Sequence, residues 1–218
     1  GASVAATQAF SLAAVNDAPI LSGTKASLAS GSEDLVYTIK AADLLAGYSD
    51  VDGDTLSVSG LALADSSKAN GTLKDLGNGS WAFTPTKDFN GTVNLSYSVI
   101  DGQGGSVAAT QTFSLAAVND APILSGTKAS LPSGTEDTVY TIKAADLLAG
   151  YSDVDGDALS VSGLSASVGS LQNNGNGTWS LTPPKDFNGT VNLSYSVTDG
   201  QGGSVAATQA FSLAAVND

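Results

Sequence analysis

The sequence predicts an all-β fold, with two tandem seven-stranded Greek-key β-sandwich domains in an end-to-end array. The first observation is a repeat, because YTIKAADLLAGYSDVDGD at 37–54 returns at 140–157 and KDFNGTVNLSYSV at 87–99 returns at 185–197. A period of roughly 100 residues is the size of an independent domain. The other two observations are runs of alternating apolar residues and the Gly-, Asn- and Asp-rich turns that separate them.

The domain boundaries follow from a further repeated stretch, SVAATQ-x-FSLAAVND, which begins at Ser3, Ser106 and Ser204. We expect residues 1–17 to be the terminal strand of a preceding repeat plus a linker. Residues 18–120 then form the first sandwich and residues 121–218 the second. The two copies differ most where LSASVGSLQNNGNGT replaces LALADSSKANGTLKDLGNGS, which predicts a variable surface loop there.

Seven strands are expected in each repeat, and in the first they cover 20–30, 35–41, 55–62, 72–75, 80–84, 92–100 and 105–118. The alternation is strict in TVNLSYSV at 92–99, where every second residue is apolar. The stretch AADLLAG predicts one helical turn, with Asp43 as its cap. Trp81, Phe83 and Tyr97 are in phase with apolar neighbours, which favours core packing over a sugar-binding platform.

Composition excludes several classes of function. The chain has 21 acidic and 8 basic residues, a net charge of −13, which argues against nucleic-acid binding. It has no His and no Cys, so a Ser-His-Asp or Cys-His nucleophile and a zinc site of the usual kind are excluded. No apolar run is long enough to cross a bilayer, so no membrane insertion is expected.

Paired carboxylates could in principle hydrolyse a substrate, with Glu33 or Glu136 as the acid. The acidic turns are polar, however, and no apolar pocket is evident around them in the sequence. We therefore expect no enzymatic activity and no small-molecule substrate.

The acidic residues are predicted to gather at the two ends of each sandwich. Tracing the strands alternately up and down places the turns that carry Asp and Glu at these ends, and stacking two sandwiches would crowd carboxylates at their junction. Crowded carboxylates repel at neutral pH. The alternative is a solvated acidic loop, in which Asp serves only as a good turn residue. Because several separate segments bring Asp to one end, we favour a divalent cation, and all-oxygen ligands favour Ca²⁺ over transition metals.

The predicted calcium ligands form two groups. Those at the junction between the repeats are Glu33, Asp88, Asn119, Asp120, Asp153, Asp155 and Asp199. Those at the equivalent outer ends are Asn16, Asp17, Asp50, Asp52, Asp101, Glu136 and Asp218. Asp-Val-Asp-Gly-Asp at 50–54 is similar to the start of an EF-hand, but its Gly53 is at loop position four and Leu61 at position twelve, so an EF-hand is rejected.

Several of these motifs resemble those of a known family of repeats. The chain resembles bacterial cadherin-like repeats, such as those in the extender regions of large RTX adhesins on Gram-negative bacteria. The matching pieces are NDAP at 119–122, ED at 136–137, SDVDGD at 152–157, PKDFNG at 184–189 and DGQG at 199–202. The cadherin Asp-Arg-Glu triplet has no counterpart here.

The resemblance implies calcium-bound β-sandwiches outside the cell, with neighbouring repeats of the same chain as partners. It assigns Asp120 as the linker aspartate that bridges two domains, and Asp153, Asp155 and Asp199 as ligands from the following domain. The expected function is that of calcium-rigidified extender repeats, which project a distal ligand-binding domain of a bacterial surface adhesin. The alternative is that the repeats themselves bind a glycan or a host protein.

Overall fold

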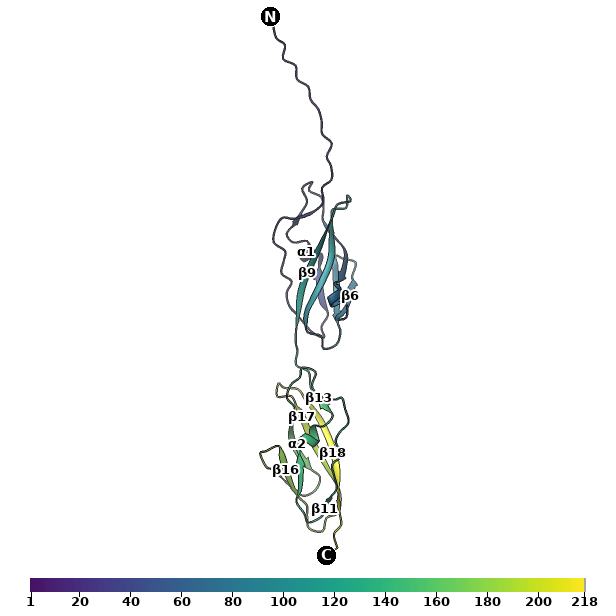
Figure 1. The fold of residues 1–218 in the computed structure, drawn as a ribbon, viewed down its shortest axis with the longest axis vertical. Helices are drawn as coiled ribbons and strands as arrows, with labels where there is room; N and C mark the ends of the chain where they lie inside the picture. Colours follow the sequence, from purple (N-terminus) through teal and green to yellow (C-terminus); the bar gives the residue numbers. More distant parts are fainter. Residues whose placement is uncertain (218) are drawn as a thin grey trace. The chain divides into compact units, whose positions relative to one another are not determined.

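The protein, described by a computed structural model over residues 1–217, consists of two compact units that divide between Val118 and Asn119. Each unit is a β-sandwich, drawn in purple to teal for the first and in green to yellow for the second (Figure 1). The predicted all-β fold with tandem sandwiches is confirmed.

The first unit is built from two main sheets with the strand orders β2-β9-β8-β5 and β3-β7-β6, and from a small β1-β4 ladder. Short helices, α1 (Ala41–Leu45) and the 3-10 turn Asp65–Ser67, join its strands. Within the described residues its strands are β1 (Ile20–Leu21), β2 (Gly31–Ser32), β3 (Tyr37–Lys40), β4 (Tyr48–Ser49), β5 (Ser57–Leu63), β6 (Gly71–Asp75), β7 (Ser80–Pro85), β8 (Gly91–Ile100) and β9 (Ser106–Ala116).

The second unit repeats this plan, with the sheet orders β11-β18-β17-β14 and β12-β16-β15 and a β10-β13 ladder. Its helix is α2 (Ala144–Leu148). Within the described part of the chain its strands are β10 (Ile123–Leu124), β11 (Gly134–Thr135), β12 (Tyr140–Lys143), β13 (Tyr151–Ser152), β14 (Ser160–Ala166), β15 (Ser170–Asn173), β16 (Thr178–Thr182), β17 (Gly189–Thr198) and β18 (Ser204–Ala214).

Two local predictions were wrong. The single strand expected over 20–30 is instead divided between β1, which is antiparallel to β4, and β2, which is parallel to β9. The chain changes sheets between them because the N–H groups of Ser22 and Gly23 both donate to the carbonyl of Gly47, which ends the ladder. Asp43 does not cap α1, since Lys40 occupies the N-cap position and Asp43 lies within the first turn.

The core lies between the two main sheets. The alternating residues of β8 (Val93, Leu95, Tyr97 and Val99) are buried, with at most 5% of each exposed. Trp81 and Phe83 of β7 are also buried, so the interpretation of these aromatic residues as core is confirmed. Burying an aliphatic or aromatic side chain of this size contributes about 1.5–3 kcal/mol.

A buried tyrosine ties α1 to the core of the first unit. The hydroxyl of Tyr97 donates to the carbonyl of Leu44 at 2.9 Å. Burial, together with the neighbouring Tyr48, raises the pKa of Tyr97 to about 12. The second unit repeats the contact between Tyr195 and Leu147, so the phenol stays neutral in both units at physiological pH.

The N-terminal segment differs from the rest of the chain. Residues 1–19 have no strand assignment, and Phe10 and Leu12 are 84% and 87% exposed. These values contrast with the buried apolar residues of the equivalent strands β9 and β18.

Candidate functional site

The end of the second unit at which its chain enters carries a group of acidic side chains. We call it the entry pole and define it by Asn119, Asp120, Asp153, Asp155, Asp157 and Asp199. Its centre is the loop after β13, where Asp153, Asp155 and Asp157 offer carboxylate oxygens within 4.8 Å of one another. The loop is folded by Asp153 itself, whose Oδ1 accepts the N–H groups of Asp155 at 3.0 Å and Asp157 at 3.4 Å.

Asp199 organises the turn between β17 and β18 and is only 4% exposed. Its Oδ1 accepts the N–H groups of Gln201, Gly202 and Gly203. The side-chain amide of Asn119 donates to its Oδ2 at 2.8 Å, and this hydrogen bond is the main cause of the lowered pKa of Asp199. A Cβ on Gly203 would lie 2.2 Å from Oδ2, so the tight turn requires glycine.

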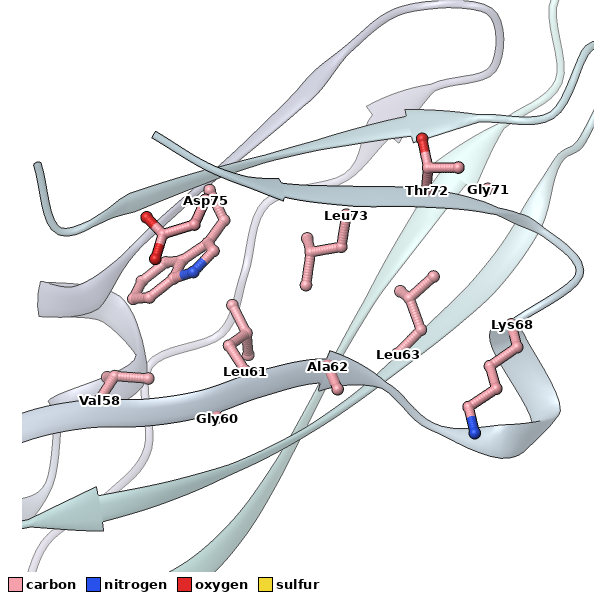
Figure 2. Close-up of a pocket in the computed structure, with 11 residues that line it drawn as sticks. Val58, Gly60, Leu61, Ala62, Leu63, Lys68, Gly71, Thr72, Leu73 and Asp75 are labelled. Carbon is pink, nitrogen blue, oxygen red and sulfur yellow. The ribbon is translucent and has the colours of Figure 1, made fainter. Parts of the chain in front are cut away.

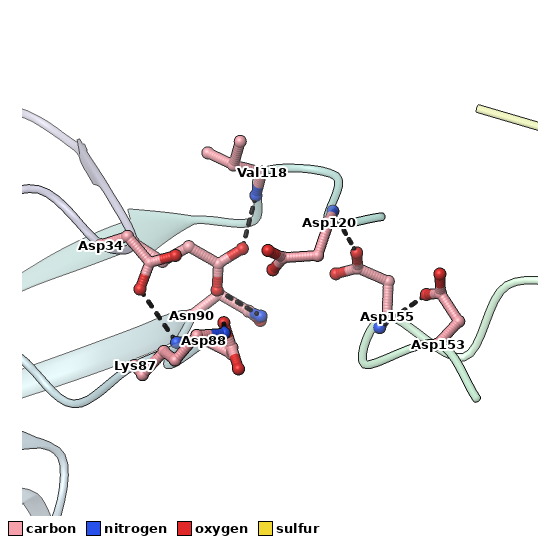
Figure 3. A network of polar contacts seen from close by, with 9 residues as sticks. Asp34, Lys87, Asp88, Asn90, Val118, Asp120, Asp153 and Asp155 are labelled. Carbon is pink, nitrogen blue, oxygen red and sulfur yellow. Dashed lines mark hydrogen bonds and ion pairs between the residues drawn. The ribbon is translucent and has the colours of Figure 1, made fainter. Parts of the chain in front are cut away.

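A second contact fastens the entering chain to the same pole. The N–H of Asp120 donates to Oδ2 of Asp155 at 2.8 Å (Figure 3). Together with the bond between Asn119 and Asp199, this contact fixes the backbone that carries the Asp120 side chain. The entry pole is therefore assembled from three segments that lie far apart in the sequence.

The donor set of the entry pole fits a hard divalent cation. Oδ2 of Asp153 is buried and has no hydrogen-bond partner among the described residues. The pKa of Asp157 is raised by burial and by the negative charges of Asp153, Asp155 and Asp199. A buried carboxylate oxygen without a donor is costly, and a cation with oxygen ligands would compensate it.

The first unit has the same entry pole, defined by Asn16, Asp17, Asp50, Asp52, Asp54 and Asp101. The side-chain amide of Asn16 donates to Asp101, which lowers the pKa of Asp101, and the N–H of Asp17 donates to Oδ2 of Asp52. Oδ2 of Asp50 is buried and has no partner among the described residues. The arrangement thus occurs independently in both units.

The opposite end of each sandwich, the exit pole, is organised by a buried glutamate. In the first unit we define it by Glu33, Asp34, Asp88, Asn90 and the backbone of Val118. Glu33 is 1% exposed; its Oε1 accepts the N–H of Val118 at 2.6 Å and its Oε2 accepts the side-chain amide of Asn90 at 3.1 Å. The N–H of Asp88 donates to Asp34 at 3.0 Å.

The exit pole of the second unit has the same form and is defined by Glu136, Asp137, Asp186, Asn188 and Val216. Glu136 accepts the N–H of Val216 at 2.8 Å and the amide of Asn188 at 3.2 Å. Asp218, which the sequence also suggests as a ligand, lies outside the described residues. Within each unit, then, the structure brings the predicted glutamate to one pole and the Asp-x-Asp loop to the other.

Sequence reasoning missed part of the exit pole. Asn90 and Asn188 are not among the ligands predicted from the sequence, yet the side-chain amide of each donates to the buried glutamate of its unit. Asp34 and Asp88, like Asp137 and Asp186, adopt positive φ angles of 57–59°. The signal that could have located these asparagines is that Phe-Asn-Gly-Thr recurs in both repeats at the start of the long strand.

A groove lies away from the poles in the first unit, between the edge strands β5 and β6. It has a volume of about 610 Å³, with Lys68 near one end and Asp75 at the other (Figure 2), and Trp81 also lines it. Its apolar wall comes from Val58, Leu61, Leu63 and Leu73. Most of these residues belong to the segment that differs between the repeats.

Comparison with known families decides the classification. A model of the cadherin-like domain matches residues 15–116 and again residues 118–214. The chain belongs to the cadherin-like domain family. No curated protein matches it.

One solved structure in particular agrees with this cadherin-like fold. The chain is similar to domains EC1-2 of human protocadherin-24, with 16% identity and a TM-score of 0.51 over 92% of this chain and 99% of that one. It is also similar to domains 3-6 of protocadherin Gamma B2, with 13% identity and a TM-score of 0.49, covering 92% and 48% of the two chains.

A third similarity is to an endo-fucoidan hydrolase of glycoside hydrolase family 107, with 21% identity and a TM-score of 0.36. The match covers 93% of this chain but only 29% of the hydrolase, so the cadherin-like pair spans less than a third of that enzyme. At this identity and TM-score the likeness says nothing about activity.

Membership of the family has general consequences. Cadherin-like domains generally bind calcium, are typically non-enzymatic and are usually extracellular. Tandem domains of this kind suggest an adhesion or extender module. None of the helices in the described residues has both the length and the apolar character needed to cross a membrane.

Proposed function

We propose that these cadherin-like repeats are calcium-rigidified extender modules of a large bacterial surface adhesin of the RTX type. They would hold a distal ligand-binding domain away from the cell and would themselves catalyse no reaction. The observation that carries the proposal is the buried, unpartnered Oδ2 of Asp153, together with its copy in Asp50. In each of these acidic loops, the other oxygen of the same carboxylate accepts backbone N–H groups of the loop.

The proposed mechanism depends on how closely the chain connects one pole to the next. Val118, whose N–H is bound by Glu33, is followed directly by Asn119, whose side chain is bound by Asp199. The exit pole of the first repeat is therefore directly followed in sequence by the entry pole of the second. We propose that Ca²⁺ takes ligands from both poles, that Asp120 is a ligand shared by the two poles, and that the bound ions limit bending at this joint.

The same proposal fixes the limits of the repeats. Residues 18–120 and 121–218 are then complete repeats, and residues 1–17 are the terminal strand and linker of a preceding one. The proposed ligands are those named from the sequence, with Asp88 and Glu136 serving the exit poles. The proposed location is the outside of a bacterial cell, with neighbouring repeats as the partners.

The expected energies are modest for each site. Extracellular calcium modules have dissociation constants of about 10⁻⁴–10⁻³ M. At ten times this concentration one bound ion stabilises the folded protein by about 1.4 kcal/mol. Because the contribution recurs at every joint, a long array gains stiffness although each joint is only moderately stabilised.

Small-angle scattering with calcium and with EDTA tests the proposal. We expect EDTA to broaden the distribution of maximum dimensions and to lower the melting temperature, because uncompensated carboxylates repel at the joint. Asp120→Ala should show the broader distribution and the lower melting temperature even in the presence of calcium. Scattering curves that are identical in calcium and EDTA would rule out a calcium-dependent joint.

The groove between β5 and β6 favours a second candidate function, in which the first repeat binds a glycan or a host protein. Its volume is within the usual range for ligand sites. Glycan and host-protein arrays should then detect the chain, and Leu61→Asp should abolish that binding. Leu63→Ala is a smaller change in the same wall of the groove. It gives the first repeat the residue that the second repeat has at the equivalent position, Ala166, which lies opposite Leu193. Arrays without any binding would leave only the extender function.

A further inference from the structure

The hairpin turns that lead into β7 and β16 each carry an asparagine followed by a glycine, Asn78-Gly79 and Asn176-Gly177. This dipeptide is prone to deamidation, because glycine has no side chain to hinder the approach of its backbone nitrogen to the preceding carboxamide. The chain holds the dipeptide at six places, and the other four begin at Asn70, Asn90, Asn174 and Asn188. Any difference in reactivity between them therefore depends on the structure around each one.

The side chains of Asn78 and Asn176 are held in the same way. The hydroxyl of Ser80 donates to Oδ1 of Asn78, and the hydroxyl of Thr178 donates to Oδ1 of Asn176 at 2.7 Å. A donor on this oxygen polarises the carboxamide and stabilises the negative charge that develops there during nucleophilic attack. In the second unit the amide of Asn174 donates to the Thr178 hydroxyl at 2.9 Å, and hydrogen bonds in such a chain strengthen one another.

The attacking nitrogen and the leaving group are unhindered in both turns. Among the described residues, no acceptor binds the N–H of Gly79 or Gly177. The side-chain amides of Asn78 and Asn176 likewise donate to no described residue, and both asparagines are exposed to solvent. We propose that Asn78 and Asn176 are sites of spontaneous deamidation, with water as the only co-reactant.

A neighbouring asparagine shows how the structure discriminates within one turn. Asn174 lies two residues from Asn176, and its Oδ1 also accepts a hydroxyl, that of Ser180. Its amide, however, donates to two hydroxyls, and the N–H of Gly175 donates to Oδ1 of Asn173 at 2.8 Å. Both the nucleophile and the leaving group of this pair are therefore engaged, so Asn174 is protected.

The three remaining pairs are protected for other reasons. The amides of Asn90 and Asn188 donate to the buried glutamates of the exit poles, and the glycines that follow them begin β8 and β17. Asn70 is half-buried, and Gly71 after it lies against the backbone and an aromatic side chain of β7.

The reaction balances without a cofactor. The backbone nitrogen of Gly79 attacks Cγ of Asn78 and loses its proton, and the bond between Cγ and Nδ2 breaks as the amide nitrogen takes up that proton and leaves as ammonia. Water then opens the resulting five-membered imide at either carbonyl, which gives aspartate or isoaspartate. A neutral side chain becomes a carboxylate, and isoaspartate also lengthens the main chain by one atom.

The lengthened main chain has a structural consequence for the short helices. The carbonyl of Gly79 accepts the N–H of Ala41, the first residue of α1, at 2.8 Å, and Gly177 makes the same contact with Ala144 of α2. An additional backbone atom before either glycine displaces this carbonyl. Deamidation therefore releases the start of the helix from the hairpin turn of its unit, independently of any calcium at the poles.

Ageing the full chain at mildly alkaline pH, followed by tandem mass spectrometry of its peptides, tests the assignment. In the folded protein we expect Asn176 to deamidate several times faster than Asn174, and Asn78 several times faster than Asn90. In urea, where the turns are lost, the members of each comparison should deamidate at similar rates. Equal rates within the folded protein would overturn the proposal.

Ser80→Ala isolates the contribution of the hydroxyl. It removes the donor to Oδ1 of Asn78 and keeps the Asn-Gly dipeptide, so deamidation of Asn78 should slow about two- to tenfold, the range for one hydrogen bond. Asn176 in the same molecule is the internal control and should react at its native rate. An unchanged rate at Asn78 would count against activation by the turn.

Amide hydrogen exchange tests the structural consequence. The N–H of Ala41 should exchange faster in protein aged until Asn78 has reacted than in fresh protein, and the N–H of Ala144 should respond to Asn176 in the same way. Unchanged exchange at both amides would show that the helices stay attached and would overturn this part of the proposal.

Discussion

Asp153→Asn is expected to lower the affinity of the second entry pole for calcium at least about tenfold, the scale of losses seen at metal sites. The substitution removes the charge of a carboxylate whose Oδ1 folds the loop and whose Oδ2 is buried without a donor. Without calcium the same variant should be slightly more stable than the native protein. The reason is that Asp157 then loses one of the neighbouring charges that raise its pKa.

Isothermal titration of calcium into the native chain and the variant measures the first effect, and thermal unfolding in EDTA measures the second. Asp50→Asn is the matched control, because it makes the same change in the first unit. It should lower the affinity of the first entry pole by a similar factor and leave the affinity at the second entry pole unchanged. Unaltered calcium affinity in Asp153→Asn would show that this carboxylate is not a ligand.

Glu33→Ala is expected to destabilise the first unit by about 3 kcal/mol, because it removes a buried carboxylate that accepts two hydrogen bonds. The donors are the N–H of Val118 and the side-chain amide of Asn90. Glu33→Gln keeps one acceptor oxygen at the site and should cost less, about 1–2 kcal/mol.

Urea unfolding can report on this unit alone. The chain has one tryptophan in each core, Trp81 and Trp179, so Trp179→Phe leaves fluorescence that reports only the first unit. In this background Glu136→Ala, which makes the same change in the second unit, should leave the signal unaltered. A midpoint for Glu33→Ala within error of its parent would mean that the buried glutamate contributes nothing to stability.

Much of the architecture was accessible from the sequence. The long period gave the size of the domain, and the strict alternation in β8 identified its buried face because one side of that strand lies in the core. The acidic turns could be assigned to poles because antiparallel strands alternate in direction. These inferences depend only on local periodicity and connectivity, which a repeat displays twice.

The remaining features depend on tertiary contacts that no local pattern specifies. The division of the first strand depends on Gly47, more than twenty residues away, which accepts hydrogen bonds from Ser22 and Gly23. The role of Asn90 depends on a buried carboxylate in another turn. The groove required the edges of β5 and β6 to be located in space, whereas the sequence predicted these two strands without their places in the sheets.

The short parallel pairing of β2 with β9 determines how a single repeat responds to tension. Gly31 and Ser32 pair with Leu115 and Ala116, and Glu33 continues the contact through its N–H to the carbonyl of Ala116. A force applied to the two ends of the repeat pulls these parallel segments in opposite directions along their length. Their hydrogen bonds are then loaded in shear and must break together, unlike the bonds of a hairpin, which open one at a time. Forced unfolding is governed by the unfolding rate, so these few residues near the exit pole set the pulling force that a repeat withstands.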